Sequence, residues 1–211
     1  MPDSASNHVL ELWLVRHGET LWNREGRALG QSDPPLNELG IQQAERLAKR
    51  IGHLRFDAVY ASDLSRTRYT SRLVLPAADV KLEPRLREID FGAWEGKYWR
   101  EMEGADKRAL DAWFEDPYRN RAPEGESYED LLGRVREWLG ELPPSGRAIA
   151  FTHGGTIRSA LYYVTGLPHG QSWRFQVDIG SVTKLVIGDM GIIISKVNDT
   201  SHLGDLQTGP H

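Results

Sequence analysis

The sequence contains no cysteine among its 211 residues. Disulfides, thiolate nucleophiles and zinc sites with cysteine ligands are therefore excluded. This removes cysteine-dependent phosphatases, cysteine proteases and thioredoxin-like redox enzymes from consideration. Any covalent catalysis must use another side chain.

The sequence also lacks an excess of positive charge, since 26 Lys and Arg residues stand against 30 Asp and Glu residues and give a net charge of −4. Proteins that bind nucleic acids draw much of their affinity from contacts between basic side chains and phosphates. We therefore expect no nucleic-acid partner. A local group of arginines can still bind a small anion.

Long apolar runs are missing as well. The longest, such as 191–194, fall far short of the roughly 20 residues that span a bilayer. Residues 1–7 are polar and do not resemble a secretion signal. We expect a cytoplasmic protein with no membrane partner.

The overall composition, with 39% hydrophobic and 27% charged residues, is that of an ordinary globular domain. A chain of this length can bury a sizeable core. The two ends, 1–7 and 198–211, are polar, and we expect them to be flexible tails on a single domain spanning 1–211.

Predicted strands and helices alternate along most of the chain. Strands are expected at 9–15, 56–61, 80–82, 147–152, 181–187 and 192–197. Helices are expected to follow Asn37, Asp63, Ser127 and His153, with Asn37 and Ser127 as N-caps. This alternation indicates an α/β protein with a three-layer α/β/α arrangement, whose open, mostly parallel sheet has one antiparallel edge strand.

Residues 92–126 have weak periodicity and many Gly, Pro and aromatic residues, which predicts a small helical cap or lid insertion. Aromatic side chains at such spacings either stack on a substrate or pack the cap itself, and packing is the more common outcome. The aromatic residues concerned are Trp94, Tyr98, Trp99, Trp113, Phe114 and Tyr118.

Two segments of the sequence have the same pattern at the end of a predicted strand. Arg16-His17-Gly18 and Thr152-His153-Gly154 each place a histidine where a buried strand ends and a glycine permits a tight turn. In open α/β sheets, ligands bind at the carboxyl ends of the strands. Either histidine alone would be read as an ordinary loop residue, but the pair predicts a functional site.

A third predicted strand ends at Ser62, and Arg66 follows within the first turn of the next helix. Helix N-termini and arginines both favour anions. We therefore expect Arg16, Arg66 and the two histidines to converge on one anionic group.

The residues at these positions also carry a close resemblance to a known family. The matching segments are 14–20, Trp22-Asn23, Gly26-Arg27, Gly30, 33–36, Gly40, Gln43-Ala44, 61–67, 86–96, 125–127 and 152–155. In this order they resemble the histidine phosphatase superfamily, in its phosphoglycerate-mutase-like branch, over about residues 9–187. One position departs from the pattern, because many relatives have Gln where this chain has Tyr69.

The resemblance implies that His17 is a nucleophile that attacks phosphorus and becomes a phosphohistidine, which water then hydrolyses. The attacking imidazole must be neutral. The adjacent Arg16 and Arg66 disfavour the imidazolium, and the first backbone amides after the strand are expected to orient the ring.

The resemblance further implies that the phosphoryl oxygens are bound by Arg16, Arg66, His153, Asn23 and Gly154. These groups carry enough positive charge for the reaction to proceed without a metal or other cofactor. The sequence also has no Asp-x-Asp or His-Glu-x-x-His motif and no dense carboxylate cluster.

Glu88 matches the family's general acid, which protonates the leaving oxygen. Burial against Phe91 and Trp94 would favour its protonated form, whereas the neighbouring arginines would favour the carboxylate. The alternative for Glu88 is a surface ion pair with Arg85 or Arg87.

The sequence favours a phosphatase of small phosphomonoesters over three alternative functions. A cofactor-dependent phosphoglycerate mutase would need extra basic residues over the site, but Glu88 and His153 are only 65 positions apart, and only Arg119 and Arg121 resemble the adjacent Arg pair that such mutases carry. A catalytically weak phospho-ligand-binding protein would not need an intact nucleophile and acid. A dinucleotide-binding domain is excluded because no Gly-x-Gly-x-x-Gly motif follows the first strand.

The expected partner is a small phosphorylated metabolite, and the sequence does not identify it. Homodimer formation through an edge strand or through Gln171 to Val177 is an open alternative that the sequence does not establish.

Overall fold

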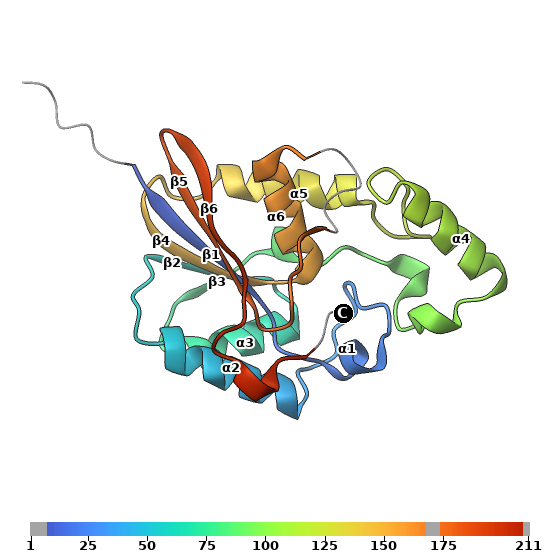
Figure 1. Cartoon of the computed structure of the whole chain (residues 1–211), viewed down its shortest axis with the longest axis horizontal. Helices are drawn as coiled ribbons and strands as arrows, with labels where there is room; N and C mark the ends of the chain where they lie inside the picture. The colour runs from blue at the N-terminus through green and yellow to red at the C-terminus, as the bar shows by residue number, and fades with distance from the viewer. Residues whose placement is uncertain (1–7, 168–173, 209–211) are drawn as a thin grey trace, which may run out of the picture.

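The computed structural model describes residues 8–167 and 174–208 (Figure 1). The strands are β1 (Leu10–Arg16), β2 (Ala58–Ala61), β3 (Val80–Leu82), β4 (Gly146–Thr152), β5 (Val182–Gly188) and β6 (Gly191–Asp199). The α-helices are α1 (Leu21–Glu25), α2 (Glu38–Ile51), α3 (Ser65–Val74), α4 (Gly104–Glu115), α5 (Tyr128–Gly140) and α6 (Gly154–Thr165).

In the described part of the chain, the strands form one six-stranded sheet in the order β3-β2-β4-β1-β5-β6. The pairs β1–β4, β2–β4 and β2–β3 are parallel, whereas β5 is antiparallel to both of its neighbours. The edge strand β6 is thus paired antiparallel with its neighbour, as the sequence predicts. The tight 188–191 turn pairs β6 with the outer side of β5, and β1 occupies the inner side of β5, so that the antiparallel pairing also includes β1 and β5.

Helices cover both faces of the sheet, with α2 and α3 on one face and α5 and α6 on the other (Figure 1). Alternate residues of the central strands face opposite layers, as the strand period of two requires. The α5/α6 face takes Leu10, Leu12, Leu14, Ala148 and Ala150. The α2/α3 face takes Val15, Ile149 and Phe151, so the predicted three-layer α/β/α architecture is confirmed.

The helix starts follow the predicted capping chemistry at two positions. The Asn37 side chain accepts a hydrogen bond from the Gly40 amide at the start of α2, and Ser127 and Asp130 form a reciprocal capping box at the start of α5. Side-chain acceptors at these positions satisfy amides that have no partner within the helix. By contrast, Leu64 precedes α3 and has no side chain that can cap it, and the Ser65 amide donates to Asp33 Oδ1 at 2.7 Å instead.

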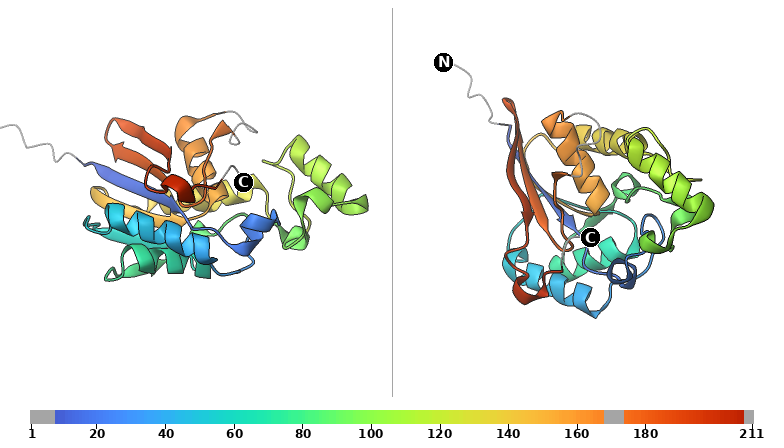
Figure 2. Two further views of the ribbon diagram at one scale, coloured as in Figure 1. Left: turned by 60° about the horizontal axis from the view of Figure 1, so that its bottom comes forward. Right: turned by 45° about the vertical axis from the view of Figure 1, so that its right-hand side comes forward.

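Residues 92–126 contain two short 3-10 helices and the longer α4, which lies beyond the carboxyl end of β1 (Figure 2). Trp94 and Trp113 are fully buried and pack edge to face at 6.0 Å between ring centroids. Phe91 and Trp99 join them, whereas Phe114 is 56% exposed. Most of these aromatic residues therefore pack the core.

The C-terminal part of the described chain differs from the flexible tail that its polar composition predicts. Strand β6 extends to Asp199, and Leu203 is completely buried. Arg50 on α2 makes two hydrogen bonds to the Asp199 carboxylate, at 3.1 and 2.7 Å. Gln43 on α2 also donates to the Leu206 carbonyl at 2.9 Å, so several contacts attach residues 198–208 to this helix. Residues 1–7 and 209–211 lie outside the described residues.

Candidate active site

The two predicted histidines meet at the carboxyl edge of the sheet. Arg16 and Thr152 are paired across β1 and β4, so His17 and His153 follow the same register position. Their rings lie edge to face with 5.1 Å between centroids. Both side chains are buried, at 2% and 0% exposure.

His17 is held as a neutral imidazole in one tautomer. Its Nδ1 lies 2.7 Å from the Gly18 carbonyl oxygen, which can only accept, so Nδ1 carries the proton and Nε2 keeps its lone pair. Burial, followed by the charges of Arg66 and Arg16, holds the pKa of His17 well below its usual value of 6.5. The ring is thus prepared to act as a nucleophile through Nε2.

The Gly18 carbonyl, and not a backbone amide as the sequence analysis expects, orients the His17 ring. The Gly18 amide donates instead to Thr70 Oγ1 at 3.3 Å. Glycine is required here by close packing, because a Cβ at residue 18 would collide with the backbone of Gly40 at the start of α2. The turn after β1 therefore depends on how closely α2 approaches it.

Arg66 lies in the first turn of α3 and is completely buried beneath the two histidines. Its Nη1 donates to the Ser32 carbonyl at 2.7 Å, its Nη2 to the Gly30 carbonyl at 2.5 Å, and its Nε to His153 Nδ1 at 3.3 Å. Burial lowers the pKa of Arg66 to about 10, so the guanidinium stays charged at neutral pH.

Arg16 ends β1, and its Nη1 donates to the Val177 carbonyl at 2.7 Å. Its buried Nε has no hydrogen-bond partner in the described part of the chain. Burial, with a smaller contribution from the nearby Arg158, lowers the pKa of Arg16 to about 10, so it also remains a cation. A buried donor without a partner is suited to an anionic ligand.

His153 complements His17. Because its Nδ1 accepts from Arg66, a neutral His153 carries its proton on Nε2. This Nε2 is buried and has no partner within residues 8–167 and 174–208. Burial, then the charge of Arg66, holds the pKa of His153 well below its usual value of 6.5. His153 can therefore donate a hydrogen bond to an oxyanion without becoming an imidazolium.

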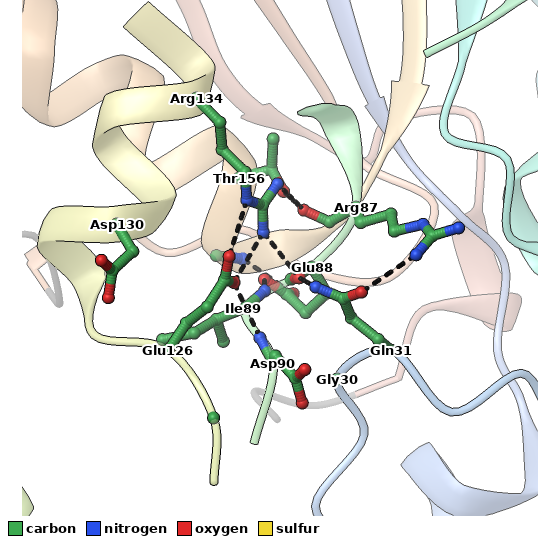
Figure 3. Close-up of polar contacts among 12 residues, drawn as sticks. Gly30, Gln31, Arg87, Glu88, Ile89, Asp90, Glu126, Asp130, Arg134 and Thr156 are labelled. Atoms are coloured by element: carbon green, nitrogen blue, oxygen red, sulfur yellow. Dashed lines mark hydrogen bonds and ion pairs between the residues drawn. The ribbon is translucent and has the colours of Figure 1, made fainter. Parts of the chain in front are cut away.

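Glu88 lies on an irregular loop (Figure 3), close enough to Arg16 and Arg66 for its charge to raise their pKa values. One carboxylate oxygen accepts from the Gly155 amide at 2.9 Å and the other from the Ile89 amide at 3.0 Å. A Cβ on residue 155 would collide with this carboxylate, so glycine permits the approach. The structure shows no ion pair between Glu88 and Arg85 or Arg87, which bind Glu83, Glu141 and Asp63 instead.

Gly154 begins α6 directly after His153, where helix amides and the helix dipole favour an anion. Asn23 has a different position. Its Oδ1 accepts from the Thr20 amide and hydroxyl at 3.1 and 2.9 Å, in the capping box of α1. The Nδ2 group of Asn23 has no hydrogen-bond partner among the residues that the structure describes, and none of the Asn23 hydrogen bonds there reaches the histidines.

Arg158 also belongs to this cluster, although it is not among the residues predicted from the sequence. It lies on α6 four residues after Gly154, and its Nη1 would be 3.4 Å from a Cβ on that glycine. Its Nε donates to the Phe175 carbonyl at 3.1 Å. The helical spacing of four residues, which places two positions on one face, is the signal that could have identified it.

The described residues contain no group of three or more His, Asp or Glu side chains placed to hold a metal ion. None of their helices combines the length and the apolar character needed to span a bilayer.

The comparisons with known proteins agree with this geometry. The chain is 35% identical, over 92% of its length and 95% of the relative's, to a protein named "Probable phosphoglycerate mutase GpmB" from Enterobacter sp. (strain 638). The crystal structure of the alpha-ribazole phosphatase from Shigella flexneri superposes with a TM-score of 0.83 at 30% identity, covering 90% of this chain and 96% of that one. Phosphoserine phosphatase from Entamoeba histolytica, in complex with 3-phosphoglyceric acid, gives 0.78 at 27% identity, covering 92% and 99%.

A sequence profile matches residues 12–200, which include both histidines, both buried arginines and Glu88. The profile describes the histidine phosphatase superfamily (branch 1), and this chain belongs to that family.

Proposed function

We propose that this protein is a metal-independent phosphatase that hydrolyses small phosphomonoesters through a phosphohistidine on His17. The observation that carries the proposal is the state of His17, which is neutral, has its proton on Nδ1 and is flanked by two buried cations. A histidine nucleophile requires a free Nε2 and nearby positive charge for the phosphoryl oxygens.

In the first step, the His17 Nε2 lone pair forms a bond to phosphorus while the ester P–O bond breaks. Arg16, Arg66 and His153 bind the equatorial oxygens, and Glu88 gives its proton to the leaving alkoxide. In the second step, water attacks the phosphohistidine, Glu88 takes a proton from the water, and the P–N bond breaks. The products are an alcohol and inorganic phosphate, and the enzyme returns to its starting state.

The surroundings of Arg119 and Arg121 support hydrolysis over mutase activity. Their side chains are 70% and 60% exposed and face acidic partners, Asp116 for Arg119 and Asp130 for Arg121. Both arginines therefore form ion pairs at the protein surface and do not form a basic pair over the histidines. A phosphohistidine without such a pair is open to water.

A second candidate, a cofactor-dependent phosphoglycerate mutase, is favoured by the name of the Enterobacter relative and by the phosphoglycerate in the Entamoeba structure. The two reactions share the phosphohistidine and differ in what accepts its phosphoryl group. The third candidate, a weak phospho-ligand binder, does not explain why the nucleophile, both cations and the acid are all present.

We further propose that the substrate is a small phosphorylated metabolite of the cytoplasm. The names of the relatives support several substrate types, among them α-ribazole phosphate and phosphoserine. The charge of Arg158 beside Arg16 supports a substrate that carries a second anionic or polar group.

The test is phosphate release from p-nitrophenyl phosphate and a panel of sugar phosphates, phosphoserine and phosphoglycerates, all in excess EDTA. Wild type and His17→Ala are compared. We expect EDTA-resistant hydrolysis by wild type and a loss of at least about 10³-fold in the variant.

Activity that survives His17→Ala, or that requires added metal, would contradict the mechanism. Conversion of 3- to 2-phosphoglycerate with a bisphosphoglycerate primer, without phosphate release, would identify the mutase instead. Tight binding of phosphate without either reaction would identify a phospho-ligand binder.

A further inference from the structure

Glu88 lies in a segment that has no regular secondary structure. The 3-10 helix Pro84–Leu86 ends two residues before it, and residues 88–90 belong to neither helix nor strand. The backbone carbonyls in such a segment have no ladder partners, so other groups must satisfy them. The position of the Glu88 carboxylate therefore depends on what binds this loop from outside.

Arg134, on α5, supplies that contact (Figure 3). Its Nη1 donates to the carbonyls of Arg85 and Arg87 at 2.7 and 2.6 Å, and its Nη2 donates to the carbonyl of Glu88 at 2.8 Å. One planar guanidinium thus binds three carbonyls within four residues. This fixed donor geometry is a property of arginine that lysine does not share.

Glu126 fixes Arg134 in turn. Its carboxylate accepts from Arg134 Nε at 3.2 Å and Nη2 at 3.0 Å, and also from the Asp90 amide at 3.0 Å. The side chains of Arg134 and Glu126 are 16% and 21% exposed, so solvent weakens the pair little. The pair holds both ends of the loop, at residues 85–88 and at residue 90.

The opposite side of the loop has its own contacts. Thr156 Oγ1 donates to the Arg87 carbonyl at 2.9 Å, and the Gly155 amide binds the Glu88 carboxylate, both from α6. The loop therefore lies between α6, which binds the Glu88 carboxylate and the Arg87 carbonyl, and α5, which binds three backbone carbonyls. Loss of the α5 contact would leave the Glu88 carbonyl with only the longer hydrogen bond from Gln31 Nε2, at 3.4 Å.

We propose that Arg134, held by Glu126, is a positioning residue that places Glu88 to protonate the leaving oxygen. This proposal rests on the function proposed above. Arg134 does not touch the reacting atoms, and it acts only through the loop that carries Glu88.

The experiment compares kcat/KM for p-nitrophenyl phosphate and phenyl phosphate, in wild type and in Arg134→Met. The two esters have nearly the same shape. Nitrophenolate leaves without a proton near neutral pH, whereas phenolate benefits from an acid. kcat/KM includes only the steps through phosphoryl transfer to His17, so hydrolysis of the phosphoenzyme does not affect the comparison.

We expect Arg134→Met to lower kcat/KM for phenyl phosphate at least about tenfold more than for p-nitrophenyl phosphate. Glu88→Gln should change the two values in the same direction. Arg136→Met is the matched control, because Arg136 is an exposed arginine on the same helix. It should leave both values unchanged. Arg134→Lys keeps the charge but not the fork of donors, and should fall between wild type and Arg134→Met.

If Arg134→Met does not fold, Glu126→Gln gives the same comparison, since it removes the charge that fixes Arg134. Equal losses on both esters in a folded variant, or no loss, would overturn the inference and leave the proposed function intact. Failure of wild type to hydrolyse either ester would overturn the proposed function and this inference together.

Discussion

Burial of two histidines beside two arginines determines the chemistry at the residue scale. Arg16, Arg66, His17 and His153 are all at most 7% exposed. An isolated buried charge is costly, so the histidines stay neutral while backbone carbonyls accept from the arginines. The result is a cationic site around a neutral imidazole whose Nε2 is free, an arrangement compatible with a phosphate ester at neutral pH.

The same burial predicts how stability depends on pH. The pKa values of His17 and His153 are held well below 6.5, and that of His202 is lowered to about 4, in each case chiefly by burial. Unfolding lets these residues bind protons as the pH falls through 6.5. The free energy of unfolding should therefore hold the full contribution of these neutral histidines above pH 6.5. Below pH 6.5 it should decrease, by up to about 1.4 kcal/mol per pH unit for each histidine.

Urea denaturation between about pH 7.5 and pH 5 measures this slope. His202→Gln removes one contributor outside the candidate site and should reduce the slope by roughly a third. A free energy of unfolding that is constant over this range would show that the buried histidines are not neutral.

A second residue-scale prediction concerns Gly155. A Cβ there would displace the Glu88 carboxylate, whereas the other neighbour, Leu131, lies at an ordinary contact distance of 3.4 Å. Gly155→Ala should thus fold normally but lower kcat/KM by about 10- to 100-fold for phenyl phosphate.

Gly133→Ala is the matched control, because a Cβ on this α5 glycine meets no atom within 4 Å. It should keep full activity and gain roughly 0.4–1 kcal/mol of stability. Equal activity of the two variants would mean that Glu88 does not need its observed position.

At the scale of elements, the sequence predicts most strands and helix starts because their signals are local. Buried strands are continuous apolar runs, and Asn37 and Ser127 are caps. The short helix α1 is missed because its five residues contain no buried position and therefore no hydrophobic period. The place of Asn23 in the α1 capping box could not be predicted for the same reason.

The packing of the C-terminal segment is also not predicted from the sequence, because residues distant in sequence bind this segment to the rest of the protein. Asn198, at φ 55°, accepts from the Asp178 amide at 2.6 Å and donates to its carboxylate at 2.9 Å. The segment after Asp178 in turn binds the Arg16 and His17 backbones, through Ser181 and Gly180. A polar composition alone does not predict these contacts.

We therefore expect Asn198→Ala to affect both stability and turnover. It leaves the Asp178 amide without its partner and places an alanine in the left-handed region, so unfolding should become easier by about 1–3 kcal/mol. Chemical denaturation and kcat under conditions where the variant is folded are the measurements. An unchanged free energy of unfolding would show that the contact between Asn198 and Asp178 is incidental.

At the scale of the whole molecule, the cap and the sheet share one core. Trp94, Trp113 and Met102 of segment 92–126 are in the same buried cluster as Leu12 and Leu14 of β1. The sequence analysis predicts an inserted cap but not this continuity, because weak periodicity says nothing about which surface a segment covers. A cap that shares the core cannot open as an independent lid without exposing tryptophans.

Trp113→Ala tests this continuity. It removes a side chain that is 2% exposed, which should cost about 3–5 kcal/mol and destabilise the sheet together with the cap. Tryptophan fluorescence and far-UV circular dichroism should then report one coincident unfolding transition at a lower midpoint. Two separate transitions would indicate an independently folding cap.

The covalent intermediate on His17 is the central step of the proposed reaction, and one measurement tests it directly. Wild type is mixed with its best phosphate ester, quenched in base during turnover and digested with trypsin. The digestion separates peptide 17–24, whose only histidine is His17, from peptide 148–158, whose only histidine is His153. We predict a phosphoryl group on peptide 17–24 that forms and decays at the rate of turnover. Phosphorylation of peptide 148–158 instead, or hydrolysis with no phosphorylated peptide under rapid quench, would contradict it.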